Sequence, residues 1–184
     1  MEQLRELLPD DAIMANGAGN YAIWLHRFWR YRQYGSQLSP TSGSMGYGLP
    51  AAIAGKLRNP NKPVICFAGD GCFQMAGLEF ATAAQTGAAI VVLLFDNGLY
   101  GTIRMHQERD YPNRVSATTL TNPDFALLAK ACGGHGELVE KTEEFSPSFE
   151  RATNSGLPSI IHIKTNPDVI TPATTLTKLR NAAK

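Results

Sequence analysis

AGDGCFQMAGLEFATAAQTGAAIVVLLFDNGLYGTIR, residues 68 to 104, holds two polar clusters that each follow an apolar run. The first run, VICFAG at 64 to 69, ends in GDG, and the second, IVVLLFD at 90 to 96, leads into DNGLYG. Such runs are typical of parallel strands buried on both faces, and residues 74 to 87 between them have a helical pattern. We therefore predict two parallel strands joined by a crossover helix, with both clusters at the carboxyl edge of the sheet, where open α/β sheets bind ligands.

The same alternation of apolar runs and helical patterns continues through the rest of the chain. Further strands are expected at AIMAN (12 to 16) and PSIIHIKT (158 to 165). Further helices are expected at 20 to 31, 47 to 57, 123 to 132 and 146 to 155. This order predicts an α/β fold, with a mostly parallel sheet sandwiched by helices. The tail from 171 to 184 has no strand pattern and no strong helix pattern, so we expect it to be extended across the surface or frayed.

Length and charge exclude several classes of protein. The chain has 184 residues, enough for one domain, and 43% of them are hydrophobic against 18% charged, as in ordinary globular proteins. Seventeen Lys and Arg against sixteen Asp and Glu leave a net charge of +1, so no basic field for nucleic acid exists. No apolar run reaches the ~20 residues that cross a bilayer, and the N-terminus has no signal-peptide pattern. We expect a single domain over 1 to 184, soluble and cytoplasmic, with neither a nucleic-acid nor a membrane partner.

The two polar clusters supply oxygen atoms of the kind that bind Mg²⁺. Asp70 offers a carboxylate, Asn97 offers a side-chain carbonyl, and the turn after Asn97 can aim a backbone carbonyl, that of Leu99, at the same point. Gly71 has no Cβ to obstruct a phosphate, and the amides of residues 71 and 72 open a helix, whose N-terminus attracts anions. GDG alone is also typical of a tight turn with an Asp cap. Its pairing with an Asn at the next strand end favours a magnesium-diphosphate ligand.

The chain resembles a known enzyme family at these positions. GDG at 69 to 71 followed by DN at 96 to 97 is similar to the thiamine diphosphate signature, and SPTSGSMGYGLPAAIAGKL at 39 to 57 resembles the segment upstream of it in acetolactate synthase-like enzymes and related 2-oxo-acid decarboxylases. The resemblance covers nearly the whole chain and matches the C-terminal, diphosphate-binding domain of those enzymes. Their full chains also carry a pyrimidine-binding domain and a middle domain, neither of which is present here.

The resemblance implies how the chain would work. Thiamine diphosphate and Mg²⁺ would be the cofactors, a 2-oxo acid the substrate, and decarboxylation or carboligation the reaction. A pyrimidine-binding domain of the same or another subunit would complete the site, within a homo-oligomer. Because that domain carries the glutamate that activates the cofactor, the isolated chain is expected to be inactive. FAD stays open as a further cofactor of the full-length enzyme.

The resemblance also implies roles for individual residues. The metal ligands would be Asp70, Asn97 and the carbonyl of Leu99, and the residues lining the diphosphate would be Gly71, Cys72, Tyr100 and Gly101. The backbone of Gly43 would accept the 4′-amino group, and Met45 would be the apolar wedge under the bent cofactor. The first loop of the family corresponds to Gly19, Asn20 and Tyr21, which are expected to touch the diphosphate.

Three positions depart from the family pattern. Cys72 stands where Ser is usual, so the backbone amide has to carry that phosphate contact. Asp96 stands where Asn is frequent. His106 stands where housekeeping acetolactate synthases have a Trp that shapes the acceptor pocket, so we expect His106 to face that pocket, with a solvent-facing His as the alternative.

Other interpretations stay open at this point. GAGNYA at 17 to 22 matches a dinucleotide fingerprint, but no acidic residue follows about 20 positions on for the ribose. Glu79 is expected to be a structural helix residue and not the activating glutamate. The chain could also be a separate β-type subunit of a two-chain decarboxylase, or a non-catalytic diphosphate-binding module. Binding of Mg²⁺-ADP without preference for thiamine diphosphate would indicate the last.

Overall fold

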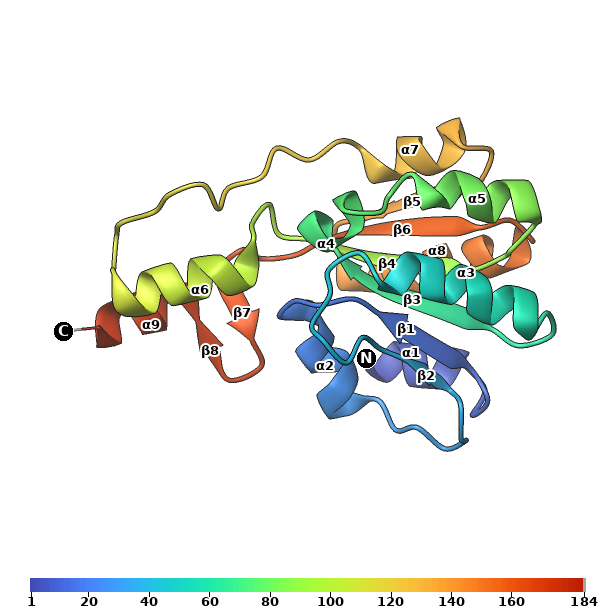
Figure 1. Ribbon diagram of the computed structural model, residues 1–184, viewed down its shortest axis with the longest axis horizontal. Coiled ribbons are helices and arrows are strands. Elements are labelled where there is room, and N and C mark those ends of the chain that lie inside the picture. Colours follow the sequence, from blue (N-terminus) through green and yellow to red (C-terminus); the bar gives the residue numbers. More distant parts are fainter. Residues whose placement is uncertain (184) are drawn as a thin grey trace.

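The computed structural model describes residues 1–183, and a six-stranded, fully parallel sheet forms its centre (Figure 1). From one edge to the other the strands are β2 (Gln37–Leu38), β1 (Ile13–Asn16), β3 (Val64–Gly69), β4 (Val91–Asp96), β6 (Ser159–Lys164) and β5 (His135–Val139). The four predicted strands are present as β1, β3, β4 and β6, and the α/β fold class is confirmed.

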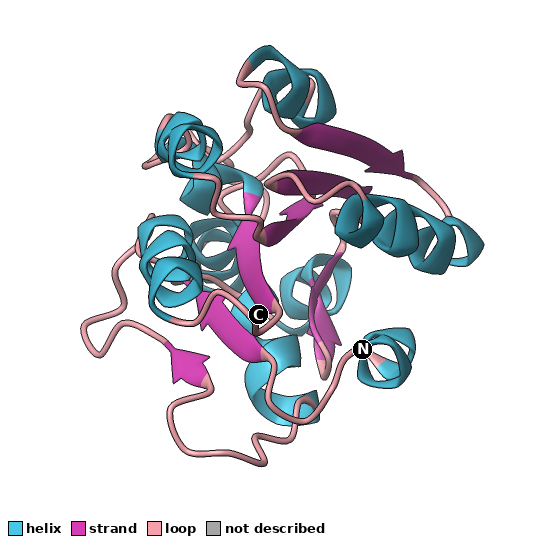
Figure 2. Cartoon of the chain, turned by 90° about the vertical axis from the view of Figure 1, so that its right-hand side faces the viewer, coloured by secondary structure: helices cyan, strands magenta, loops and turns pink. Residues whose placement is uncertain are grey.

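Helices cover both faces of the sheet, as Figure 2 shows from the side. One face packs against α3 (Gly48–Arg58), α5 (Glu79–Thr86) and α7 (Phe125–Ala131), and the other packs against α1 (Glu2–Leu7), α2 (Tyr21–Phe28) and α8 (Phe145–Asn154). Alternation along each strand explains the two cores. In β3, Val64 and Cys66 belong to the first core, while Ile65 and Phe67 belong to the second. Burial on both faces is why the central strands read as unbroken apolar runs.

Residues 171–183 are ordered, which corrects the expectation of an extended or frayed tail. A short antiparallel pair, β7 (Val169–Thr171) and β8 (Thr174–Thr175), leads into α9 (Leu176–Ala182). The side chain of Thr175 caps α9 by accepting a hydrogen bond from the amide of Lys178. These elements pack against α6 (Gly101–Asp110), and we call the four together the C-terminal lobe. The lobe lies beyond the carboxyl edge of the sheet, at the left of Figure 1.

Other elements differ in detail from the prediction. The helix expected over 74 to 87 is two helices, α4 (Asp70–Gln74) and α5, with Gly77 between them. A Cβ at Gly77 would lie 2.9 Å from the ring of Phe73, so the break permits a close contact. Helix α6, strand β5 and the 3-10 turn η1 (Thr142–Glu144) were not predicted. Within residues 1–183, no helix has the length and apolarity that a membrane span requires.

Candidate functional site

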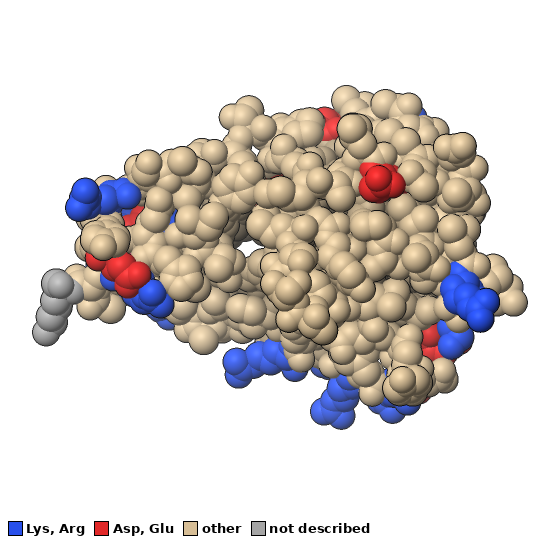
Figure 3. Space-filling view, in the orientation of Figure 1, with Lys and Arg blue, Asp and Glu red and all other residues tan. Residues whose placement is uncertain are grey.

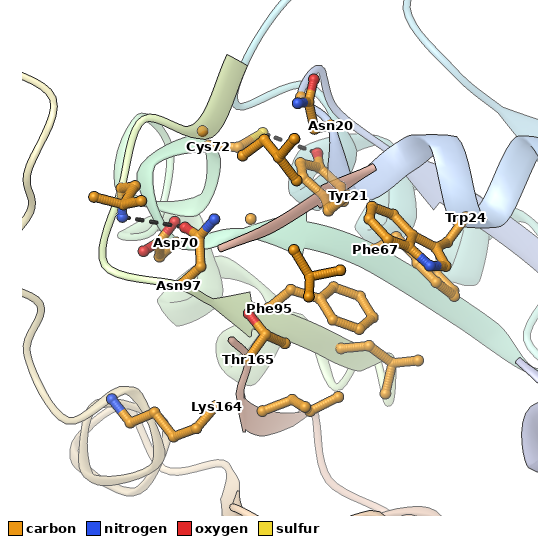
Figure 4. Close-up of a pocket in the computed structure, with 18 of the residues that line it drawn as sticks. Asn20, Tyr21, Trp24, Phe67, Asp70, Cys72, Phe95, Asn97, Lys164 and Thr165 are labelled. Atoms are coloured by element: carbon orange, nitrogen blue, oxygen red, sulfur yellow. Dashed lines mark hydrogen bonds between the residues drawn. The ribbon is translucent and has the colours of Figure 1, made fainter. Parts of the chain in front are cut away.

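A cavity of about 730 Å³ opens at the carboxyl edge of the sheet and continues along the face that α1, α2 and α8 cover. Figure 4 shows it between the end of β3, the end of β4 and helix α2, with Trp24 and Phe67 on its apolar side. The residues predicted to bind the cofactor all line it: Gly19, Asn20, Tyr21, Gly43, Met45, Asp70, Gly71, Cys72, Asn97, Leu99, Tyr100 and Gly101. Segments 80 residues apart in the sequence thus meet at this cavity, as Asn20 and Thr102 do directly, 82 residues apart.

Asp70 is the buried acid of this cavity. It directly follows β3, is 3% exposed, and accepts hydrogen bonds from the amides of Gly71 and Gly98, both at 2.9 Å, and from Nδ2 of Asn122 at 2.8 Å. None of the ion pairs found within residues 1–183 involves it. Burial raises the pKa of Asp70 above its usual value, against the opposing effect of the hydrogen bonds from Asn122 and Gly71. Its negative charge therefore lacks a compensating cation.

The negative charge of Asp96, at the end of the neighbouring strand β4, is compensated. Its carboxylate contacts Nε2 of His162 at 2.8 Å and Nζ of Lys164 at 2.5 Å. Burial opposes its ionisation, but the hydrogen bonds from Lys164, His162 and Asn122 outweigh burial and lower the pKa of Asp96. The structure therefore places a neutralised carboxylate beside an uncompensated one, and only Asp70 of the two lines the cavity.

The turn after β4 carries the other predicted oxygen ligands. Gly98 has a φ of +68°, and the turn is closed by a hydrogen bond from the amide of Leu99 to Oδ1 of Asn97 at 3.1 Å. A returning segment pairs with this turn, because the amide of Tyr100 donates to the carbonyl of Thr118 and the amide of Leu120 donates to that of Gly98. The turn that exposes Asn97 and Leu99 to the cavity is thus held from both sides.

The oxygen atoms of Asp70, Asn97 and Leu99 that line the cavity fit a hard divalent cation. No group of three or more His, Cys, Asp or Glu that could hold a metal occurs in residues 1–183, so a site here depends on one carboxylate, an amide oxygen and a backbone carbonyl. Such a set suits Mg²⁺, which uses one or two carboxylates and completes its octahedron with phosphate oxygens and water. The uncompensated charge of buried Asp70 is the observation that supports this fit.

Gly71 and Cys72 contact residues from distant segments that the sequence did not predict as their partners. A Cβ at Gly71 would lie 2.6 Å from the ring of Tyr100, so the missing side chain makes room for that ring. The Sγ of Cys72 accepts hydrogen bonds from the hydroxyl of Tyr21 and the amide of Gly46, both at 3.2 Å. Burial is the main cause that raises the pKa of Tyr21, and the neighbouring Cys72 is the second cause. Cys72 thus connects α4 with the start of α2 and with the loop before α3, and Figure 4 shows its contact with Tyr21.

Two further residues define the rim of the cavity. Gly43 has a φ of +66°, a left-handed conformation that favours glycine, and a Cβ there would meet no atom within 4 Å. Met45 is 38% exposed although it lines the cavity. An apolar side chain at an open rim is available to a ligand that enters the cavity.

The expectation that His106 faces an acceptor pocket stays a prediction. His106 is exposed on α6 and is not among the residues that line the cavity; Thr102 and Ile103 are the α6 residues that line it beyond Gly101. Helix α6 runs outward from the sheet edge. His106 lies about one turn beyond Ile103, roughly 5 Å further along the helix axis. Glu79 is exposed in the first turn of α5 and is also outside the cavity.

Sequence reasoning missed several contributors. The end of β6 and the C-terminal lobe supply Lys164, Thr165 and Ile170 to the cavity wall, and Asn122 contacts Asp70 from the segment before α7. The position of Thr165 as the last residue of a predicted strand was a usable signal, since all parallel strands end at the same edge. Nothing local in the sequence marks Asn122 or Ile170.

The fold and this cavity define an α/β domain that presents a ligand site at the carboxyl edge of a parallel sheet. Residues 17–163 match the family described as "Thiamine pyrophosphate enzyme, C-terminal TPP binding domain". The chain belongs to this family.

Acetolactate synthases are among the known proteins that are similar to this chain. The acetolactate synthase isozyme 2 large subunit of Escherichia coli (strain K12) is 31% identical over 165 residues, which cover 89% of this chain and 30% of that protein. The acetolactate synthase large subunit of Lactococcus lactis subsp. lactis (strain IL1403) is 40% identical over 130 residues, 70% of this chain and 23% of that protein. The chain thus spans less than a third of the length of these relatives.

Solved structures agree with the family. The thiamine diphosphate-dependent 4-hydroxybenzoylformate decarboxylase of Rhodococcus jostii RHA1 superposes with a TM-score of 0.80 at 30% identity, over 89% of this chain and 31% of that one. The benzoylformate decarboxylase of Polynucleobacter necessarius gives a TM-score of 0.82 at 24% identity, over 90% of this chain and 32% of that one, and supports the fold.

Proposed function

We propose that this chain binds the magnesium-diphosphate end of thiamine diphosphate in an acetolactate synthase-like enzyme that decarboxylates or ligates 2-oxo acids. Asp70, Asn97 and the carbonyl of Leu99 hold Mg²⁺, and the backbone around Gly71 and Gly101 receives the diphosphate. One observation carries the proposal: a buried carboxylate without a cation partner lies at the strand edge where Asn97 and Leu99 meet it. The family membership of the chain and its relatives support the choice of cofactor.

The residues of this chain bind and orient, while the cofactor supplies an electron sink for loss of CO₂ from the substrate. The apolar wall that includes Trp24, Phe67 and Phe95 excludes water from the inner cavity. Met45 would support the cofactor at the rim, and the backbone carbonyl of Gly43 would accept a hydrogen bond from its amino group. These contacts fix the reacting atom relative to the substrate, which is the protein's main contribution.

The activating acid comes from another domain in this proposal. The acids that line the cavity are Asp70, which is committed to the metal, and Glu140, which is exposed beside η1. The face seen in Figure 3 is mostly uncharged, with Lys and Arg at its margins. Met45 is an exposed apolar side chain at the rim, and Tyr47, Met75 and Leu78 are further exposed apolar side chains of the chain. A pyrimidine-binding domain of the same or another subunit covers this rim, and the enzyme is a homo-oligomer.

Cofactor titration tests the proposal. Thiamine diphosphate should quench the fluorescence of the purified chain, because Trp24 lines the cavity, and should do so only when Mg²⁺ is present. Asp70→Asn and Asn97→Ala should each abolish the metal-dependent signal, since each removes an oxygen ligand or its charge. Thr82→Ala, on exposed α5 away from the cavity, is the matched control. Equal binding of Mg²⁺-ADP, or unchanged binding in both site variants, would contradict the proposal.

A second experiment tests the division of labour between domains. The purified chain with thiamine diphosphate and Mg²⁺ should release no appreciable CO₂ from pyruvate, because the acid at the pyrimidine end is not in its cavity. Rapid turnover by the chain alone would show that one of its own acids activates the cofactor, and Glu140 would be the first to replace.

A further inference from the structure

The amide of Asn122 lies between two buried carboxylates. Its Nδ2 donates to Oδ2 of Asp70 at 2.8 Å and to Oδ1 of Asp96 at 2.7 Å. The backbone N–H of Gly98 is shared between the same two oxygens, at 2.9 and 3.0 Å. Two donors from separate segments therefore hold the carboxylates side by side, at the base of the turn that carries Asn97.

The orientation of Asn122 is itself fixed. Its Oδ1 accepts a hydrogen bond from Nε2 of Gln74 at 2.9 Å, so its NH₂ group must face the carboxylates. Just before Asn122, the chain pairs with the turn after β4 through Leu120 and Gly98. The side chain thus joins α4, the turn after β4 and the segment before α7 at one point.

Asn122 supplies hydrogen bonds without supplying charge. Asp96 receives positive charge from Lys164 and from His162 when that ring is protonated, but Asp70 receives only neutral donors. A Lys or Arg in place of Asn122 would neutralise Asp70. The amide instead fixes the direction of the Asp70 carboxylate and leaves its charge for a cation.

We propose that Asn122 is a positioning residue that gives the cation site its preference for Mg²⁺ over Ca²⁺. The inference rests on the proposed function, because it requires a metal at Asp70. Mg²⁺ demands near-ideal octahedral geometry at short distances, whereas the larger Ca²⁺ accepts variable geometry and ligand number. A carboxylate held in one orientation suits Mg²⁺. Ca²⁺ binds as well to a carboxylate that can rotate as to one that is held.

The test compares the two ions in variants of the full chain. Thiamine diphosphate is held at saturating concentration, fluorescence quenching is followed, and Mg²⁺ or Ca²⁺ is titrated. In Asn122→Ala the half-saturating Mg²⁺ concentration should rise about 10- to 100-fold, the range typical for loss of a partner of a metal ligand. The corresponding rise for Ca²⁺ should be clearly smaller.

Gln74→Leu is the second variant, because the side chain of Gln74 is exposed and its amide donates a hydrogen bond to Oδ1 of Asn122. Without this donor the Asn122 amide is held less firmly, so the half-saturating Mg²⁺ concentration should rise about two- to tenfold, as for loss of one hydrogen bond. Asn59→Ala is the matched control: it removes an asparagine whose amide bonds to the carbonyl of Gly55 at the end of α3, and it should change neither ion's affinity.

The outcomes separate the two proposals. If the parent chain shows no metal-dependent binding, the proposed function fails and this inference fails with it. If the parent binds as expected, unchanged Mg²⁺ affinity in both variants, or equal losses for Mg²⁺ and Ca²⁺, would overturn the positioning role. Thermal unfolding of each variant confirms that it is folded at the temperature of the titration, and the ratio of the two ions is a readout that simple destabilisation does not move.

Discussion

Replacing Arg180 by Met should release α9 from the rest of the molecule. Arg180 forms a forked pair with Glu108, from Nε to Oε2 at 2.9 Å and from Nη2 to Oε1 at 2.6 Å. Glu108 is 1% exposed on α6, so the variant leaves a carboxylate buried without its main partner. This pair joins two helices of the C-terminal lobe that are 72 residues apart in the sequence.

The size of the effect follows from what remains around Glu108. Removing one partner of a buried ion pair typically costs about 3–5 kcal/mol. Oε2 of Glu108 keeps a hydrogen bond from the amide of Asn113 at 3.1 Å, and Arg104 stays 4.0 Å from Oε1. We therefore expect a loss near the lower end, about 3 kcal/mol in the free energy of unfolding at pH 7.

The loss should depend on pH. The hydrogen bond from Arg180, against the opposing effect of burial, lowers the pKa of Glu108 to about 2 from its usual value of 4.5. A carboxyl group whose pKa is lowered by folding stabilises the fold above its unfolded pKa and loses that contribution as the pH falls through its folded pKa. The difference between parent and variant should thus be full above pH 4.5 and shrink between pH 4.5 and 2.

Denaturant unfolding at pH 7 and pH 3 measures this difference, and hydrogen exchange locates it in α9 and α6. Arg151→Met is the matched control, because Arg151 forms a similar forked pair with Glu137 but is itself 55% exposed. A surface pair of this kind contributes about 0–1 kcal/mol. The reasoning would be refuted if Arg180→Met cost no more than Arg151→Met, or if its cost were the same at both pH values.

Three further substitutions test the cavity. Gly71→Ala should destabilise the fold by about 1–3 kcal/mol and weaken cofactor binding, since its Cβ would lie 2.6 Å from the ring of Tyr100; unchanged thermal unfolding would exclude this contact. Met45→Ala should lower turnover of the completed enzyme more than cofactor affinity, because the diphosphate anchor remains; a large loss of affinity with full turnover would contradict the wedge role. His106→Trp should leave the preference among 2-oxo acids unchanged, because His106 is outside the cavity; an altered profile in a competition assay would return it to the substrate pocket.

The buried strands were predictable because burial on both faces leaves a direct record in the sequence. β3 was predicted at 64 to 69 and is Val64–Gly69, and β4 was predicted at 90 to 96 and is Val91–Asp96. β5 was missed because it lies at the edge of the sheet, where HGELV alternates between buried and more exposed positions and includes a glycine.

The helices of the C-terminal lobe were missed for a different reason. α6 is strongly polar and has no marked apolar face, and α9 is only about two turns long. Their stability depends on each other through Glu108 and Arg180, and no local pattern reports a contact between residues 72 positions apart. Prediction from periodicity fails where tertiary contacts replace intrinsic preference.

The candidate site could likewise be predicted only in part. Residues that directly follow the apolar strands, such as Asp70 and Asn97, could be placed because the strand ends define the edge of the sheet. The partners that hold them, Asn122 for Asp70 and Tyr21 for Cys72, come from distant segments. His162 likewise bonds to Asp96 across 66 residues, and no local sequence pattern indicates this contact.

The position of β6 in the sheet has a consequence for biosynthesis. β4 pairs with β6, and their partners Asp96 and Lys164 are 68 residues apart, while β5 pairs only with β6. At the usual translation speed of roughly 5–20 residues per second, the open side of β4 waits about 3 to 14 seconds for its neighbour to emerge from the ribosome. During that interval a row of unpaired amides and carbonyls beside Leu93 is exposed to other nascent chains, so slower initiation or a holdase chaperone should raise the soluble yield, and slower elongation should lower it.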